Sequence, residues 1–424
     1  MDGLTPGLFE RAVEERRAPA LAFLAEHGRY RRAVSTFPSL TPVCLSSLAT
    51  GAHPDVHEIP HLVWWHRGER RIVEYGSSFG AIRAAGFGRA IRDTIIDMNA
   101  RHLGRGAVTV FESLEDAGLT PAAVNFTCYR GRTRHVAAVP GFPAAPGPRR
   151  FFFYNLFESD ATGAPISWRS RAGGTIDGYA AAAARWLVTR DGFDFLVFYL
   201  SDLDYASHAV GPDEADDALV RSDLHVAALL EAAGGPDEFL ERYAVIVCSD
   251  HGQTSVERAV SLAPRFPDAI VTASNRAAMV YGDDARALAE RLDGEAAVEV
   301  ALFREDGLAV ARRDGEEARF GADGPVGGDA TILDGPDAPA RAWAALANPN
   351  AGEVVVSAAP GWEFTDLAGR HHAGGGSHGS LAAGDSEVPM LAVGVDADPA
   401  SIVDVAPAVL AHFGVEPPAY ARAA

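Results

Sequence analysis

Two short and almost wholly apolar runs constrain the fold of this chain more than any other feature. They are Phe193–Leu200 (FDFLVFYL) and Ala244–Cys248 (AVIVC). Strands that are apolar on both faces are typical of parallel sheets covered by helices on both sides. Between the two runs, Asp217–Ala233 has the apolar spacing of a helix that ends at Gly234. The pattern predicts a β-α-β unit with two fully buried strands.

Short β-rich runs alternate with helical patterns over most of the chain, which favours an α/β fold with a doubly wound, mostly parallel sheet. One segment, residues 276–349, differs because it combines strands and a helix with a hairpin. Its expected elements are a strand at Ala277–Tyr281, a helix at Asp284–Leu292, a strand at Val298–Phe303 and a hairpin that turns at Asp314-Gly315. The segment is predicted to form a small α+β lid subdomain.

The lid interrupts a core whose sequence continues after it. We expect this α/β core to consist of residues 1–275 and 350–424, and a chain of 424 residues is long enough for both parts. Val354–Ser357 and Met390–Val393 are predicted to be strands of the main sheet.

Composition excludes several classes of partner and mechanism. The net charge of −20, from 57 acidic and 37 basic residues, argues against a nucleic acid polymer or an anionic membrane as partner. The sequence contains no Lys, so Schiff-base, pyridoxal-phosphate and P-loop mechanisms drop out.

The cysteine content and the hydropathy of the sequence indicate the cellular compartment of the protein. Cys44, Cys128 and Cys248 are too few and too scattered for a disulfide framework, and we interpret them as buried thiols of a reducing compartment. No apolar stretch approaches the roughly 20 residues that a membrane span requires. No signal peptide is apparent either. We therefore expect a cytoplasmic protein.

Aspartate and histidine residues follow both apolar runs. Asp204 and His208 lie in SDLDYASHAVGP, Asp250 and His251 in VIVCSDHGQ, and His378 in the Gly-rich segment GGGSHGSL. Carboxylates and imidazoles are the ligands that hard or borderline divalent metals prefer. Open α/β sheets bind ligands at the carboxyl edge of their strands. The sequence therefore predicts a metal site at this edge.

The segment SLTPVCLSSLATG (Ser39–Gly51) has residues typical of both the start and the end of a helix. Thr41 is a good N-cap, Pro42 suits the first helical position and Gly51 suits the C-terminal cap. A hydroxyl at this place faces free N–H groups and the positive end of the helix dipole, which suits a phosphate. One interpretation is that Thr41 only caps the helix. The other, favoured by a metal cluster nearby, is that its hydroxyl attacks a phosphoryl group.

Together these motifs resemble the alkaline phosphatase superfamily, in particular its nucleotide pyrophosphatase/phosphodiesterase branch. The motifs occur in the order expected for that branch over nearly the whole chain. They are Thr41 followed eight residues on by Ala49-Thr50-Gly51, the turn His53–Pro60, Asp204 and His208 before Gly211-Pro212, Ser249–Gly252, Gly376–Gly379, and a closing helix in Ser401–Val415.

The resemblance implies two divalent metal ions and a Thr nucleophile. One ion would be held by Asp204, His208 and His378. The other would be held by Asp250, His251, Thr41 and one further Asp, for which the candidate is Asp2. Such ions clamp phosphoryl oxygens and lower the pKa of the Thr41 hydroxyl, so that attack gives a phospho-threonine intermediate. Mixed imidazole and carboxylate ligands favour Zn²⁺, with Mn²⁺ as the alternative.

Asp2 lies in MDGLTPG, whereas the resembling branch has an apolar strand before its Asp-Gly. We expect the native polypeptide to carry roughly 6–15 further residues before Met1, mostly Val, Leu and Ile, because a strand of usual length sets that range. The alternative is that Asp2 is an ordinary terminal residue.

The chain also departs from the branch after the nucleophile. The branch has an Asn there that donates to the phosphoryl oxygen, and no Asn lies near the corresponding Leu62. Trp64 and Trp65 are candidates to stack on a flat leaving group of the substrate, or they pack in the core. Cys44 begins a segment distantly like the sulfatase motif, but the Arg of that motif is missing.

The resulting prediction is a two-metal phosphoester hydrolase that acts on small-molecule substrates as a phosphodiesterase or nucleotide pyrophosphatase. The alternatives are a phosphomonoesterase or phosphonate hydrolase of the same superfamily. A further alternative, from a different functional class, is a catalytically weak binding protein that keeps the fold.

Overall fold

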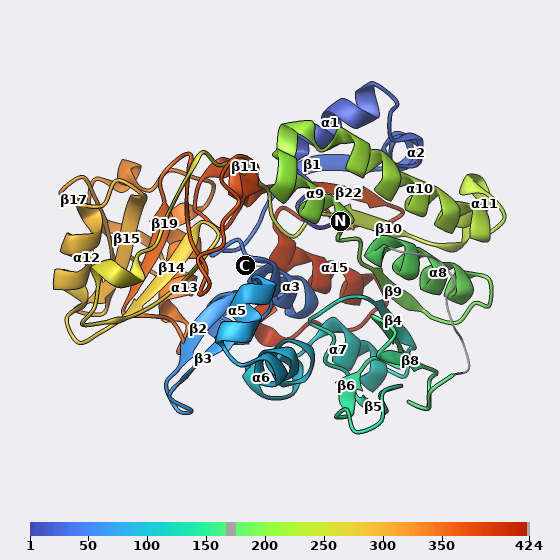
Figure 1. Cartoon of the computed structure of the whole chain (residues 1–424). Helices are drawn as coiled ribbons and strands as arrows, with labels where there is room; N and C mark the ends of the chain where they lie inside the picture. Colours follow the sequence, from blue (N-terminus) through green and yellow to red (C-terminus); the bar gives the residue numbers. More distant parts are fainter. Residues whose placement is uncertain (167–174, 422–424) are drawn as a thin grey trace.

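The computed structural model describes residues 1–166 and 175–421 (Figure 1). Its main part contains two sheets, with strand orders β8-β7-β4-β9 and β1-β22-β10. Their strands are β8 (Phe157–Ser159), β7 (Arg150–Phe153), β4 (Pro121–Val124), β9 (Phe195–Phe198), β1 (Arg29–Val34), β22 (Glu387–Val393) and β10 (Val245–Cys248). Strand β4 pairs in parallel with β7 and β9, whereas β22 runs antiparallel to β1 and β10.

Helices cover these sheets on both faces, as a doubly wound fold requires. One group packs together above the sheets in Figure 1 and includes α1 (Pro6–Glu14), α2 (Pro19–His27), α10 (Asp216–Ala232) and α11 (Pro236–Arg242). The second group includes α3 (Thr41–Thr50), α7 (Val110–Asp116) and α15 (Val405–His412). The predicted α/β class with a mostly parallel central sheet is confirmed. Among the described residues, no helix has both the length and the apolar character needed to cross a bilayer.

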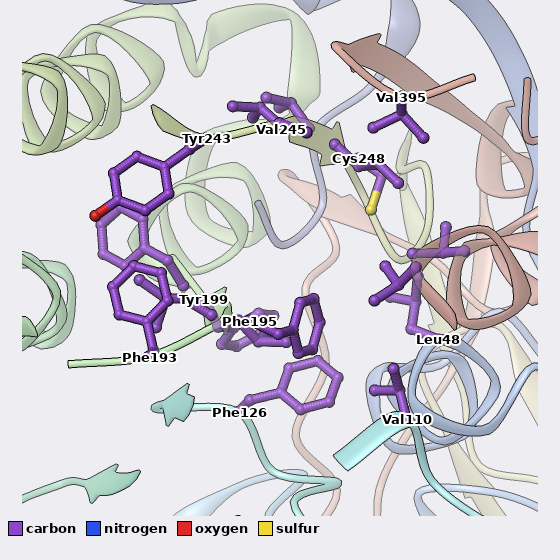
Figure 2. Close-up of a pocket in the computed structure, with 18 of the residues that line it drawn as sticks. Leu48, Val110, Phe126, Phe193, Phe195, Tyr199, Tyr243, Val245, Cys248 and Val395 are labelled. Atoms are coloured by element: carbon purple, nitrogen blue, oxygen red, sulfur yellow. The ribbon is translucent and has the colours of Figure 1, made fainter. Parts of the chain in front are cut away.

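The two apolar runs do form strands, β9 and β10, but they are not fully buried as predicted. Every residue of Phe195–Phe198 and Val245–Cys248 is only partly buried. The reason is that β9 ends one sheet and β10 ends the other, so no β-ladder joins them. The chain between them passes through α9 (Asp202–Val210), α10 and α11, and a cavity separates the two strands (Figure 2).

Outside this main part lies a separate antiparallel sheet of seven strands, named the second sheet to distinguish it from the sheets of the main part, with the order β13-β14-β19-β15-β16-β17-β18. Its strands are β13 (Ile270–Ser274), β14 (Ala277–Tyr281), β19 (Val354–Ala358), β15 (Val298–Glu305), β16 (Leu308–Arg313), β17 (Glu316–Gly321) and β18 (Gly324–Gly328). Strands β14 and β15, the hairpin of β16 and β17, and the helix α12 (Ala285–Asp293) match the elements predicted for the lid, whereas β13, β18 and β19 were not predicted for it.

The prediction for Val354–Ser357 was wrong, because this segment lies in β19 between β14 and β15 of the second sheet. Its residues are apolar on both faces because α12 covers one face of that sheet and α13 (Ala338–Ala347) covers the other. Such a strand is indistinguishable by pattern from one in a parallel sheet. Met390–Val393 does lie in β22 of the main sheets. The division into a core and a lid domain stays a prediction.

Candidate metal centre and active site

The predicted metal ligands lie together at the carboxyl ends of β9 and β10. Helix α9 follows β9 and carries Asp204 and His208 one turn apart. The loop after β10 carries Asp250 and His251, while Asp2 lies beside both strand ends. His378 follows the short strand β21 (Gly376–Ser377). Asp2, Asp204, Asp250, His251 and His378 are all at most 7% exposed.

The ligand atoms form two overlapping groups, each with its members within 4.8 Å of one another. One group is Asp204, His251 and His378, and the other is Asp2, Asp250 and His251. His251 Nε2 lies 3.2 Å from Asp2 Oδ1 and 3.7 Å from Asp250 Oδ2. Among the described residues, His251 thus belongs to both groups, whereas His208, which the resemblance assigned to the first metal, belongs to neither.

His208 lies on the outer side of Asp204. Its Nε2 atom is 3.2 Å from Asp204 Oδ2, and its ring is stacked on His372 with centroids 4.0 Å apart. His372 is in turn 3.2 Å from the buried carboxylate of Glu363. This contact places His372 behind a predicted ligand, where it can fix the orientation of the His208 ring.

Backbone carbonyls orient all three imidazoles. The Nδ1 atoms of His208, His251 and His378 lie 2.7, 2.9 and 2.7 Å from the carbonyl oxygens of Gly376, Gly252 and Ser39. With a proton on Nδ1 donated to these carbonyls, each Nε2 lone pair faces the cluster. A hydrogen bond of this kind is the usual support of a histidine that binds a metal.

The cluster concentrates negative charge where water is excluded. Burial, together with the carboxylates of Asp250 and Asp204, raises the pKa of Asp2 to about 8. Burial acts to lower the pKa of His251, but Asp250 and Asp2 outweigh it and raise that pKa to about 10. Asp2 Oδ1 and Asp250 Oδ2 are buried and have no hydrogen-bond donor within the described chain. Buried charges of this kind require a partner or a metal, so the residues present fit divalent cations.

Thr41 lies beside this cluster, with Oγ1 3.2 Å from His251 Nε2. Contrary to prediction it is not the N-cap, because α3 begins at Thr41 and its N-cap is Leu40. The Leu40 carbonyl accepts the first helical hydrogen bonds, and the Thr41 hydroxyl makes no capping bond. The hydroxyl is thus directed to the cluster. Gly51 ends the helix in the left-handed conformation, as predicted.

Three residues that the sequence did not single out also contact the cluster. The Tyr199 hydroxyl donates to Asp2 Oδ2, and Gln253 Nε2 donates to Asp204 Oδ1 at 2.9 Å. Asn275 Nδ2 lies 3.1 Å from His378 Nε2. Asn275 has a left-handed φ of 57° in the turn between β13 and β14. Its position between two apolar runs marks a turn in the sequence, but nothing local marks it as part of the site.

The two tryptophans lie on β2 (Val63–His66). Trp64 is 1% exposed within the main core and stacks on His66, which favours the packing alternative. Trp65 is partly buried against the core of the second sheet. Its role in binding the substrate stays a prediction.

Buried carboxylates and imidazoles at the carboxyl edge of an α/β sheet are an arrangement suited to a metal-dependent hydrolase. The sequence match is more specific. Residues 1–381 match the model of the type I phosphodiesterase / nucleotide pyrophosphatase family, and the chain belongs to this family. No curated protein sequence matches the chain significantly.

Similar solved structures cover nearly the whole chain. Murine ectonucleotide pyrophosphatase / phosphodiesterase 5 has a TM-score of 0.62 at 13% identity, over 98% of this chain and 94% of its own. An inactive threonine-to-alanine variant of that enzyme, in complex with AMP, gives the same values. Phosphonoacetate hydrolase from Sinorhizobium meliloti, in complex with phosphonoformate, has a TM-score of 0.61 at 19% identity, over 97% of this chain and 94% of its own. At these identities the similarity shows the fold.

Proposed function

We propose that this member of the family hydrolyses small-molecule phosphodiesters or the phosphoanhydride bond of nucleotide pyrophosphates, with Thr41 as the nucleophile. The observation that carries the proposal is the distance of 3.2 Å between Thr41 Oγ1 and His251 Nε2. His251 belongs to the group of candidate metal ligands that also contains Asp2 and Asp250. The AMP complex of the murine enzyme, made inactive by changing a threonine to alanine, supports a nucleotide substrate and a threonine nucleophile.

We propose the two sets of metal ligands that the resemblance implied, although in the structure His251 takes the place of His208 beside Asp204 and His378. One set is Asp204, His208 and His378, and the other is Asp2, Thr41, Asp250 and His251. Two bound divalent ions, which we propose to be Zn²⁺ with Mn²⁺ as the alternative, would offset charge on the phosphoryl oxygens and lower the pKa of the Thr41 hydroxyl.

The residues of the chain then carry a two-step displacement. Thr41 Oγ1 loses its proton to solvent and forms a bond to phosphorus while the bond from phosphorus to the leaving oxygen breaks, and that oxygen leaves with a proton from solvent. Water next attacks the phosphorus and releases Thr41 Oγ1, which regains a proton. The position of Thr41 at the first turn of α3 directs free backbone N–H groups and the positive end of the helix dipole to the phosphoryl group.

Paired substrates test the proposed specificity. We expect kcat/KM for bis(p-nitrophenyl) phosphate to exceed that for p-nitrophenyl phosphate, and phosphonoacetate to release little phosphate. A monoester preference of about tenfold or more would assign the protein as a phosphatase. A preference for phosphonoacetate would favour the phosphonate hydrolase alternative, which the similar TM-scores leave open. Binding of AMP without turnover of any substrate would indicate a binding protein.

A further inference from the structure

A buried ion pair lies next to the loops that carry the predicted metal ligands, although neither of its members is a predicted ligand. Arg276 directly follows Asn275 in the turn between β13 and β14, and Asp385 lies in the short helix α14 (Ala383–Ser386) just before β22. The two side chains are 1% and 0% exposed. The pair therefore joins the second sheet to the main part of the molecule.

The pair has the geometry of a fully hydrogen-bonded contact. Arg276 Nη1 lies 2.9 and 3.0 Å from the two carboxylate oxygens of Asp385. Arg276 also donates from Nε to the Trp362 carbonyl at 3.1 Å and from Nη2 to the Ala359 carbonyl at 3.2 Å. Taking two charges out of water costs so much free energy that a buried ion pair often stabilises a fold no more than apolar side chains of similar volume. Stability alone thus gives a weak reason for this pair, and the arrangement that it imposes on its neighbours gives a better one.

The pair holds the loop that carries His251. The Thr254 hydroxyl donates to Asp385 Oδ1 at 2.7 Å and accepts a hydrogen bond from Arg276 Nη1. The N–H of Gly252 donates to the Asp385 backbone carbonyl at 3.0 Å. These bonds fix the chain one and three residues after His251.

The same pair holds the loop that carries His378 and the turn that carries Asn275. Ser380, two residues after His378, donates to Asp385 Oδ2 from its N–H at 2.9 Å and from its hydroxyl at 2.6 Å. The Arg276 N–H donates to the His378 carbonyl at 2.8 Å. Three segments that are distant in sequence therefore meet at one contact between a carboxylate and a guanidinium.

We propose that Arg276 and Asp385 are positioning residues of the active site. Their contact keeps the loops of His251 and His378 in register, so that the two imidazole rings stay stacked. A displacement of about 1 Å at a reacting group can lower a rate by about a hundredfold, so even a small shift of these loops impairs catalysis. The expected effect on turnover rests on the proposed function, whereas the effect on the two loops does not require the reaction.

Two substitutions test the proposal against a matched control. Asp385→Asn keeps the volume of the side chain but removes its charge, and Thr254→Val removes only the hydroxyl that ties the His251 loop to the pair. Asp293→Asn is the control, because it breaks an ion pair between α12 and β16 in the second sheet rather than at these loops. Urea unfolding of each variant measures the general loss of stability.

The first measurement is amide hydrogen exchange of the metal-free protein in peptides that cover residues 250–255 and 376–381. Asp385→Asn is expected to speed exchange by about tenfold or more in both peptides, and the control is expected to leave both at the wild-type rate. Wild-type exchange in both peptides of Asp385→Asn, or equal acceleration in the control, would overturn the proposal.

Thr254→Val decides the question if Asp385→Asn does not fold, because the loss of one hydroxyl is a mild change. Faster exchange confined to residues 250–255 is the expected result, since the bonds from Ser380 to Asp385 remain. Wild-type exchange in that peptide would overturn the proposal.

The second measurement is turnover of bis(p-nitrophenyl) phosphate by the metal-loaded protein. Asp385→Asn is expected to lower kcat by about tenfold or more and to keep KM within about threefold, because the reacting groups are displaced while the substrate contacts remain. A wild-type kcat in this variant would show that the pair only stabilises the fold, and would overturn the positioning role. A wild-type protein without turnover would contradict the proposed function, whereas the exchange rates, measured without metal or substrate, decide the positioning role by themselves.

Discussion

The imidazole rings of His251 and His378 stack face to face, with centroids 3.6 Å apart and an interplanar angle of 7°. One ring follows β10 and the other follows β21, so the stack joins two loops that are distant in sequence. Each ring is fixed through Nδ1 to a backbone carbonyl. The stack thereby places two predicted nitrogen ligands side by side, one from each of the two predicted ligand sets.

We predict two divalent ions per chain. Elemental analysis of protein prepared without chelator should find about two equivalents of Zn or Mn, and removing them should abolish turnover until metal is returned. Asp204→Asn should lower the metal content, because it removes the carboxylate shared by His208 and Gln253. The exposed Asp213→Asn on the same segment is the control and should keep both ions. Only traces of metal, without activation by added Zn²⁺ or Mn²⁺, would refute the two-metal site.

We predict that Thr41→Ala loses about a thousandfold or more in kcat, because the substitution removes the oxygen that attacks phosphorus. The fold and the metal content should stay unchanged. The hydroxyl makes no helix-capping bond, so unfolding stability should change by less than about 1 kcal/mol. Thr41→Ser retains a hydroxyl and should recover part of the activity. Kinetics, metal analysis and urea unfolding of both variants provide the measurement, and near-wild-type turnover of Thr41→Ala contradicts the mechanism.

Asn275 is predicted to bind a phosphoryl oxygen. Its amide lies 3.1 Å from His378 Nε2, and when that nitrogen binds a metal the amide becomes free to donate to the substrate. Asn275→Gly suits the φ of 57° and removes only the side chain. It should lower kcat/KM by about tenfold to a hundredfold with unchanged metal content. Asp314→Gly, at a left-handed position in a hairpin turn, is the matched control and should be neutral. Unchanged kcat/KM in Asn275→Gly would remove Asn275 from the site.

Acid should destabilise the fold from about pH 6.5 downward. Burial lowers the pKa of His57 to about 3 and those of His61 and His135 to about 4. Below the unfolded pKa of about 6.5 the unfolded chain binds protons that the folded chain does not, so each such His costs up to about 1.4 kcal/mol per pH unit.

Urea midpoints measured at about pH 7.5 and pH 5 check this dependence. His135→Gln should make the fall in stability with decreasing pH shallower, since it removes one of the titrating groups. His412→Gln, at an exposed position, should leave the dependence unchanged. Midpoints that stay constant between the two pH values would contradict the prediction.

The sequence identified candidate site residues best where a polar side chain directly follows a predicted strand. Asp204 and Asp250 come just after apolar runs, and the carboxyl edge of an α/β sheet brings such residues together. The lid elements were predictable for a similar reason, because strand, helix and hairpin signals in Ala277–Gly321 are local.

Other features depend on tertiary neighbours and leave no local signal. Asn275 and Tyr199 reach the cluster from a turn of the second sheet and from the end of β9. The N-cap of α3 is Leu40, one residue before the predicted Thr41, because sequence patterns define helix ends only to within one or two residues. The partial burial of β9 and β10 depends on what lies between them, which their own residues do not encode.

Trapping the covalent intermediate tests the central claim most directly. The enzyme is mixed with bis(p-nitrophenyl) phosphate, quenched in acid during turnover, digested and examined by mass spectrometry. We predict that the peptide containing Thr41 gains the mass of a nitrophenyl-phosphoryl group, localised to Thr41, and that Thr41→Ala shows no such adduct. Turnover without any adduct on Thr41, or an adduct on another residue, would contradict the assignment of Thr41 as the nucleophile.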